Sequence, residues 1–278
     1  MGPRISIVTP SFNSGKYIED AILSVLGQKY ENFEHIIVDG GSKDGTVEIL
    51  KKYPHLRWVS EPDKGQSDAL NKGFRMATGE IVGWLNADEF YLPKAFETIA
   101  SAWTIHPEAT IWYGDAIFSD AKGDFLRYRK SNLFDKQILL YYGPFLATCT
   151  TFINKTIIEE DFFLDVAYHY VMDQEYLVRL ATAGKEFFYT SKELAVFRWT
   201  GENKSLNNIP ASFAESLSIR RKYGVTRSHS RRGLRFFYRL YRIKRVILHR
   251  LLRLGMLHEF SASIKYKNTN MRWFKDDY

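Results

Sequence analysis

Residues 79–89, Gly-Glu-Ile-Val-Gly-Trp-Leu-Asn-Ala-Asp-Glu, constrain the fold more than any other stretch of the chain. The apolar run from Ile81 to Leu85 is typical of a buried strand. It leads into Asp88 and Glu89, and acids at the carboxyl end of a strand in an open α/β sheet lie where ligands bind. Two adjacent carboxylates repel each other unless a cation neutralises them, and oxygen ligands suit Mg²⁺ or Mn²⁺. The stretch predicts a metal site, with a solvated acidic turn as the alternative.

Short strands alternate with helices through the first half of the chain. The apolar runs predict strands at Ile5–Thr9, Phe33–Val38, Leu56–Ser60 and Ile81–Leu85. Apolar residues at helical spacing predict helices at 17–28, 47–52 and 66–77. Strand–helix–strand units at this spacing predict right-handed crossovers and a mostly parallel sheet.

Polar or acidic groups follow each of these four strands, so we expect them to meet at one edge of the sheet. A carboxylate such as Asp39, at the end of the second strand, can accept hydrogen bonds from a nucleotide's ribose or base. The Gly-x-Gly-x-x-Gly fingerprint and the Gly-x-x-x-x-Gly-Lys-Ser/Thr phosphate loop are both missing. This argues against an ordinary dehydrogenase and a P-loop enzyme. A metal held by Asp88 and Glu89 then becomes the natural partner of a diphosphate.

The length and composition of the chain limit the number of domains and indicate the cellular compartment. A chain of 278 residues is long enough for one large domain or a domain with an appendage. Cys149 is the single cysteine, so no intrachain disulfide forms and a reducing compartment is expected. The amino terminus lacks a signal-peptide apolar region, and no stretch approaches 18 uninterrupted apolar residues. We expect a cytoplasmic protein without a transmembrane helix.

Six sequence blocks follow one another along the chain: Ile7–Asn13, Ser24–Gln28, Val38–Thr46, Ser60–Gly65, Asp68–Gly73 and Gly79–Glu89. In this order they resemble family 2 glycosyltransferases, which are inverting enzymes of the GT-A fold that use nucleotide-diphosphate sugars. They cover most of residues 4–90, and a weaker likeness continues to about residue 205. The chain is most similar to bacterial enzymes that build O-antigen and other surface polysaccharides.

The resemblance implies roles for individual residues. It implies nucleotide contacts from Pro10, Ser11 and Asn13, a base or ribose contact from Asp39, and a closing segment of Asp63, Lys64, Gly65 and Asp68. It also implies a metal motif at Asn86-Ala87-Asp88-Glu89, in which Glu89 stands where the family more usually has Asp. The implied cofactor is Mn²⁺ or Mg²⁺, and the expected donor is a UDP-sugar.

The resemblance also implies a general base that takes the proton of the acceptor hydroxyl. Asp173 matches the family's Asp before a Leu-rich helix ending in Arg, so we expect the base there. The alternative for Asp173 is an acid that merely stabilises the helix amino terminus. Glu175 is the second candidate for the base.

The carboxyl-terminal segment carries most of the positive charge. Thirteen Lys and Arg residues and no acid lie between Arg220 and Arg253, while the whole chain has a net charge of +7. On a helix from Leu234 to Leu254, basic and apolar residues divide between two sides, which is typical of a membrane-surface binder. We therefore expect residues 220–254 to contact an anionic membrane surface. The alternatives are a helix that packs on the catalytic domain and, with less support, nucleic-acid binding.

Together these observations predict an α/β protein with the Rossmann-like GT-A fold, in which helices flank a mostly parallel central sheet. We expect a catalytic domain at 1–208, with a nucleotide-sugar half at 1–100 and an acceptor half at 101–208. A basic amphipathic helical extension is expected at 209–278. The predicted function is metal-dependent, inverting sugar transfer to a hydroxyl of a lipid-linked glycan or surface polysaccharide, at the inner face of the membrane and without nucleic-acid partners. The alternatives are an inactive nucleotide- or sugar-binding module and, with less support, a sugar-phosphate nucleotidyltransferase.

Overall fold

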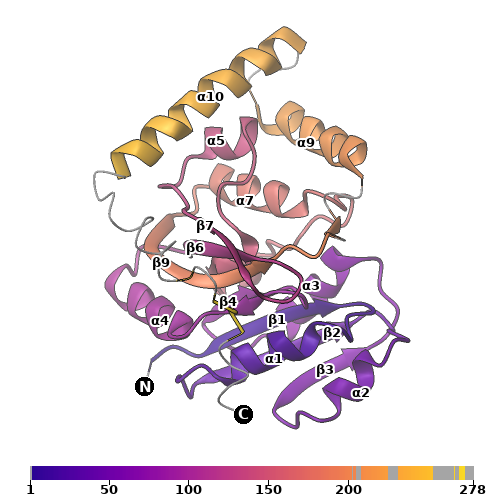
Figure 1. Ribbon diagram of the computed structural model, residues 1–278. Coiled ribbons are helices and arrows are strands. Elements are labelled where there is room, and N and C mark those ends of the chain that lie inside the picture. The colour runs from indigo at the N-terminus through magenta and orange to yellow at the C-terminus, as the bar shows by residue number, and fades with distance from the viewer. Residues whose placement is uncertain are drawn as a thin grey trace.

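The computed structural model describes residues 2–201, 203–204, 208–224, 231–252, 266 and 269–272. It confirms the predicted α/β fold class: one curled sheet runs through the molecule and helices flank it (Figure 1). Within the described residues the sheet has nine strands. Residues 225–230 and 253–254 of the predicted basic segment lie outside the described residues.

The first half of the chain builds four parallel strands, as predicted. The strands are β1 (Ile5–Ser11), β2 (Phe33–Asp39), β3 (Leu56–Ser60) and β4 (Ile81–Trp84). The helices between them are α1 (Ile18–Leu26), α2 (Thr46–Leu50) and α3 (Gln66–Met76). The register places Ser11 beside Asp39 and Asp39 beside Ser60. The strands β1, β2 and β3 therefore end together at one edge of the sheet.

The second half of the chain extends the sheet with both parallel and antiparallel pairs. Its strands are β5 (Phe90–Tyr91), β6 (Ile111–Ser119), β7 (Phe125–Arg129), β8 (Thr151–Asn154) and β9 (Phe187–Arg198). Its helices are α4 (Ala95–Ile105), α5 (Lys136–Tyr141), the 3₁₀ turn η1 (Thr148–Thr150), α6 (Thr156–Glu159), α7 (Met172–Thr182), α9 (Ile209–Tyr223) and α10 (Arg231–Leu252). β8 joins β4 to β6 by antiparallel pairing, whereas β6 and β9 run parallel. Across the sheet the strand order is β3-β2-β1-β4-β8-β6-β9-β5, and β7 pairs with β6.

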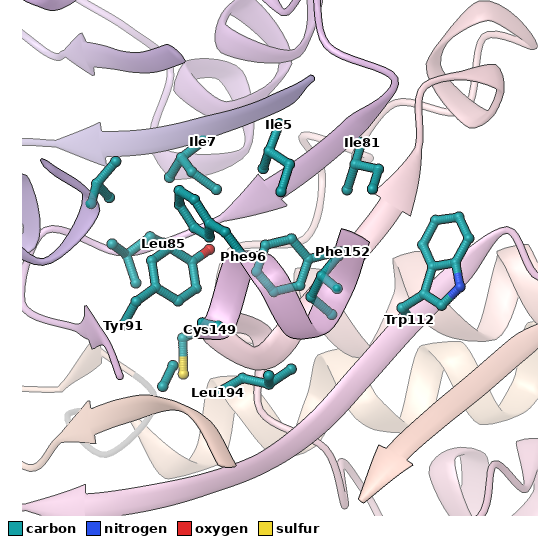
Figure 2. Packing of buried hydrophobic residues seen from close by; sticks show 14 of the residues in the cluster. Ile5, Ile7, Ile81, Leu85, Tyr91, Phe96, Trp112, Cys149, Phe152 and Leu194 are labelled. Carbon is teal, nitrogen blue, oxygen red and sulfur yellow. The ribbon is translucent and has the colours of Figure 1, made fainter. Parts of the chain in front are cut away.

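An apolar cluster packs around Ile81 of β4 and Leu85, which follows that strand and leads to Asp88 (Figure 2). Tyr91 stacks on Phe152 with ring centroids 5.5 Å apart. Gly83 lies in the middle of β4, where a Cβ atom would come within 2.7 Å of Ile7 and 2.9 Å of Phe152. A side chain at Gly83 would therefore push β4 away from its neighbours.

Glu34 is a buried carboxylate that ties β2 to its surroundings. Ser6 Oγ and Thr78 Oγ1 both donate to Glu34 Oε1 at 2.6 Å, and Arg57 donates to Glu34 Oε2 at 2.5 Å. Burial alone would raise the pKa of Glu34, but the hydrogen bonds from Ser6 and Thr78 outweigh burial and lower the pKa to about 2. The network therefore favours the ionised carboxylate in the folded state.

We expect Glu34→Gln to lower the free energy of unfolding at pH 7 by about 3 kcal/mol, because one unit of pKa shift corresponds to about 1.4 kcal/mol. A carboxylate with a depressed pKa stabilises the fold above its unfolded pKa, 4.5, and this stabilisation is lost as the pH falls towards about 2. Urea unfolding of both proteins at pH 7 and at low pH measures the difference, with the exposed Glu31→Gln as control. Equal midpoints at pH 7 would show that the network contributes nothing.

The helices α9 and α10 are packed on the second half of the sheet domain. Glu215 of α9 accepts hydrogen bonds from the backbone amides of His169, Tyr170 and Val171, at 2.9, 2.8 and 3.1 Å. These amides lie just before α7, so α9 supports the start of that helix. The predicted domain boundary after residue 208 stays a prediction, and the residues on its two sides are in contact.

The last described residues return to the first half of the chain. Met271 is buried in a cluster with Phe90 and Val196. Arg272 forms an ion pair with Asp20 of α1, which also pairs with Arg198 at 2.5 Å. Among the described helices, none has the length and apolar character needed to cross a membrane.

Candidate active site

A cavity of about 400 Å³ lies at the carboxyl edge of β1 and β4. Its wall also includes the start of α7 and the segment that follows β9. Six of the residues predicted from the sequence line it: Pro10, Asn13, Asn86, Asp88, Glu89 and Asp173. The fold thus brings the predicted metal motif and the predicted base to one cavity.

A second cavity, of about 530 Å³, lies beside the first. The predicted residues Ser11, Asp63 and Gly65 line it, and Pro10 lines both cavities. Three further residues are shared by the two walls: Phe12, Gln66 and Lys204. The two cavities therefore form one cleft over the ends of the parallel strands.

Asp39, predicted to contact a base or ribose, is fully buried and lines neither cavity. Its Oδ1 accepts from Ser42 Oγ at 2.5 Å, and its Oδ2 accepts from Ser60 Oγ at 2.6 Å and Ser42 N at 2.9 Å. Asp39 thereby shapes the loop beginning with Gly40, which does line the second cavity. In this structure its carboxylate acts on the loop rather than on the cleft.

Lys64 and Asp68 also lie outside the two cavity walls. The Lys64 backbone amide donates to Asp68 Oδ2 at 3.1 Å, and Lys72 Nζ lies 3.7 Å from the same oxygen. Gln66, between them, is the residue of this segment that faces both cavities. It was not predicted, although it directly follows the Asp63-Lys64-Gly65 motif.

Asn86 is oriented by two neighbouring side chains. Gln66 Nε2 donates to Asn86 Oδ1 at 2.7 Å, and Trp84 Nε1 donates to the same oxygen at 2.8 Å. The Asn86 backbone amide donates to Glu89 Oε2 at 3.0 Å. The turn after β4 is therefore held from three directions, which fixes where Asp88 enters the cavity.

The two acids of the predicted metal motif differ in exposure. Asp88 is partly exposed in the cavity, whereas only 1% of Glu89 is exposed. Burial, followed by the charge of Asp88, raises the pKa of Glu89 to about 8. Burial also raises the pKa of Asp88, against the opposing effect of Arg198. The pair therefore carries an electrostatic cost that a nearby cation would relieve.

The donor set fits a hard divalent cation. Glu89 Oε1 is buried and accepts no N–H or O–H hydrogen bond among the described residues, and the Cys149 thiol is the polar group beside the carboxylate. A weak thiol donor leaves this oxygen able to bind a cation beside Asp88. Within the part of the chain that the structure describes, no group of three or more His, Cys, Asp or Glu side chains is arranged to hold a metal. Mg²⁺ and Mn²⁺ sites commonly use one or two carboxylates and complete their shell with water and substrate phosphates.

Asp173, the predicted base, lies in the first turn of α7 and lines the cavity. The Gln174 amide donates to its Oδ1 at 2.8 Å. Burial raises the pKa of Asp173 above the usual range for an aspartate. A more basic carboxylate is a better proton acceptor, so this position has the chemistry that the prediction requires.

Glu175, the second candidate for the base, is buried away from both cavities. Arg179 Nε donates to Glu175 Oε1 at 3.1 Å, and the Tyr223 hydroxyl donates to the same oxygen at 2.8 Å. Lys222 Nζ lies 3.7 Å from it. These contacts give Glu175 a structural role in joining α7 to α9.

Lys204 is a basic residue of the cleft that the sequence did not predict. It lies six residues after the end of β9, more than one hundred positions from the metal motif, and lines both cavities. It is the one Lys or Arg in either described wall, whereas Asp63, Asp88, Glu89 and Asp173 are all acidic. The Asn203 side chain holds the turn before it, donating to Arg198 O at 3.0 Å and accepting from Thr200 N at 3.0 Å.

Residues 6–162 match the family described as "Glycosyl transferase family 2". Among curated proteins, the chain is 40% identical over 93 residues to the putative teichuronic acid biosynthesis glycosyltransferase TuaG of Bacillus subtilis. That match covers 31% of this chain and 36% of TuaG. The chain spans 14% to 36% of the length of the curated relatives that it matches.

Two solved structures share the fold. The mannosyltransferase PcManGT of Pyrobaculum calidifontis, in complex with GDP-Man and Mn²⁺, matches with a TM-score of 0.61 and 17% identity over 99% of this chain and 85% of that chain. TarS 1–349 of S. aureus, in complex with UDP, matches with a TM-score of 0.59 and 18% identity over 78% of this chain and 64% of that chain.

Proposed function

Because the chain belongs to glycosyl transferase family 2, we propose that it transfers a sugar, with inversion, from a nucleotide-diphosphate sugar to a hydroxyl acceptor. The observation that carries this proposal is the single cleft that joins the Asp88 edge of β4 to Asp173 of α7. A donor that spans the two cavities would have its anomeric carbon within reach of both groups.

The two cavities suit different parts of the donor. The cavity beside Asp63 and Gly40 would take the nucleoside, and the cavity beside Asp88 and Asp173 would take the sugar. The diphosphate would then lie where the walls meet. A UDP-sugar is the proposed donor, which the complex of TarS with UDP supports. PcManGT is in complex with GDP-Man, so the nucleotide base of the donor has to be tested.

Asp88 and Glu89 would hold Mn²⁺ or Mg²⁺ together with diphosphate oxygens. Such a cation supplies charge neutralisation on the diphosphate as it leaves. The hydrogen bond from Gln66 to Asn86 keeps this turn in place.

Asp173 would accept the proton of the acceptor hydroxyl. The hydroxyl oxygen attacks the anomeric carbon and forms the new glycosidic bond, while the bond from that carbon to the diphosphate oxygen breaks. The electron pair leaves with the nucleoside diphosphate and the proton ends on the Asp173 carboxylate, which balances the reaction. The raised pKa of Asp173 supports this role.

The proposed acceptor is a growing surface polysaccharide such as O-antigen, or a lipid-linked glycan. The named role of TuaG in teichuronic acid biosynthesis and the match to a chondroitin synthase of Escherichia coli, 36% identical over 99 residues, support a glycan acceptor. Incubating the protein with a panel of UDP-, GDP- and dTDP-sugars, with and without Mn²⁺, and detecting released nucleoside diphosphate would test the proposal. Binding without release or transfer from any donor would favour the inactive binding module instead.

Lys204 would contact the diphosphate, because it lines both cavities and is the one Lys or Arg in their described walls, which also hold four acids. We expect Lys204→Met to weaken UDP binding by about 10- to 100-fold, since a hydrogen bond to a charged group contributes about 1.5–3 kcal/mol. Uridine binding should stay unchanged because uridine lacks the phosphates. Calorimetric titration of both ligands into both proteins measures the two effects.

Two controls make this test specific. Lys204→Arg keeps the charge and should retain most of the UDP affinity, and Lys52→Met removes an exposed lysine on the surface near α2. An equal loss of affinity for UDP and uridine in Lys204→Met would mean that the residue shapes the cleft without contacting phosphate.

A further inference from the structure

The helix α10 uses only part of its apolar surface to pack on the protein. Phe237 and Tyr241 stack on Tyr141 of α5, with ring centroids 4.8 and 5.3 Å apart. Tyr238 stacks on Tyr142 at 5.6 Å, and Lys244 pairs with Asp135 at the start of α5. These contacts define the inner side of α10. The packing alternative predicted from the sequence is therefore correct for this side.

A second row of apolar residues faces away from the protein. The exposed fractions are 61% for Phe236, 43% for Leu240, 60% for Ile243 and 51% for Ile247. Their spacing of four, three and four residues places them along one side of a helix. We call these four residues the outer stripe. Exposing a row of large apolar side chains to water costs free energy. Such a row therefore indicates a surface that binds a partner.

Basic residues border the outer stripe. Arg232, Arg239 and Arg242 are all exposed, and their helical positions lie on the side of the stripe that faces away from α5. No acidic residue occurs between Arg220 and Arg253 to balance them. The surface is therefore apolar in the middle and positive along one flank, which is the pattern of a helix lying in the interface of an anionic membrane.

We propose that the outer stripe of α10 lies in the surface of an anionic lipid bilayer. Anionic headgroups would satisfy the flanking arginines while the acyl boundary receives the four apolar side chains. A second copy of the chain is a poorer occupant, because its own stripe carries the same positive charge and no acid.

This placement deepens the proposed function, on which it rests, by selecting a membrane-bound acceptor. Figure 1 shows α10 at the opposite end of the molecule from β2 and β3, with α5 and α7 between α10 and those strands. A bilayer under α10 would therefore lie on the side of α7, which carries Asp173. An acceptor glycan linked to lipid would reach the base from the bilayer, while the soluble donor binds over β1–β4.

The test uses the full chain and vesicles of phosphatidylcholine with or without phosphatidylglycerol. We expect the wild-type protein to sediment with the anionic vesicles, and the bound fraction to fall as salt is added. The double substitution Phe236→Ser/Ile243→Ser should weaken this binding by about tenfold or more. The matched control is Ile105→Ser/Leu126→Ser, which removes two exposed apolar side chains from α4 and β7 and should bind like the wild type.

A second pair of substitutions tests the charge. Arg239→Gln/Arg242→Gln should weaken binding to the anionic vesicles and reduce its dependence on salt. All variants should keep the wild-type melting temperature and should transfer sugar to a water-soluble acceptor at the wild-type rate. If a variant loses vesicle binding but keeps this activity, membrane binding is separate from the proposed reaction. If the wild-type protein transfers no sugar, the proposed reaction is wrong, whatever the vesicles show.

Three outcomes would overturn the membrane proposal. The first is that the wild-type protein does not sediment with anionic vesicles. The second is that the Phe236→Ser/Ile243→Ser variant binds these vesicles as well as the wild type does. The third is that light scattering shows a wild-type dimer without lipid and a monomeric variant, which would mean that a second copy covers the outer stripe.

Discussion

Replacing Asp88 with asparagine should abolish sugar transfer, with a loss on the order of a thousand-fold or more. The amide keeps the shape of the side chain but removes the charge that a divalent cation needs, and such a cation contributes several kcal/mol to stabilising the leaving diphosphate. EDTA should have the same effect on the wild-type protein, and added Mn²⁺ should restore the rate. Released nucleoside diphosphate gives the measurement.

A binding measurement separates a lost metal from a lost reaction. The affinity of the wild-type protein for UDP should rise when Mn²⁺ is added, and this dependence should disappear in Asp88→Asn. Glu48→Gln, which removes an exposed acid from α2, is the control and should behave like the wild type. Full activity of the wild-type protein in EDTA would contradict the metal assignment to Asp88 and Glu89.

Asparagine at position 173 should slow turnover by about 10²–10⁴-fold, because it cannot accept the proton of the acceptor hydroxyl. The affinity for the donor should change little, since the group acts on the acceptor, so the loss falls on kcat. The wild-type rate should rise with pH through the raised pKa of Asp173, since the ionised carboxylate is the active form. Initial rates measured against pH give both results.

Glu175→Gln is the matched comparison for this substitution, two residues away on the same helix. It removes a buried charge bonded to Arg179 and Tyr223, so we expect it to lower stability by about 3 kcal/mol. The protein that remains folded should turn over at a rate close to that of the wild type. Normal turnover in Asp173→Asn, together with a dead but folded Glu175→Gln, would reverse the two roles.

The sequence was sufficient to predict the donor half of the fold because its signals are local. Apolar runs closed by Pro10, Asp39 or Asn86 mark the strands, and residues within a few positions of each strand end form the cleft. The register then follows from parallel pairing, which sets Ser11, Asp39 and Ser60 side by side. Nothing comparable marks the pairing of β6 with β9, which joins segments about eighty residues apart.

The individual roles were harder to predict, because they depend on which neighbours already use a side chain. Asp39 has the position of a ligand-binding acid, yet Ser42 and Ser60 occupy its oxygens. Asp173 and Glu175 look alike in the sequence, and the contacts of Glu175 with Arg179 and with Tyr223 of α9 show that Glu175 is engaged. Lys204 lines the cleft although it lies far along the chain from the six blocks. The spacing of residues within those blocks could therefore not predict it.

The attachment of Met271 and Arg272 beside α1 has a consequence for acceptor length. The stretch that contains α10 is fastened to the protein at two places, on α5 through Phe237 and Tyr241 and on α1 through Arg272. On a bilayer, such an enzyme would hold Asp173 at a nearly constant height above the headgroups. A glycan whose terminal hydroxyl lies below or above that height would not reach the donor. The attachment of the enzyme to the bilayer would therefore select acceptors by the number of sugars in their glycan.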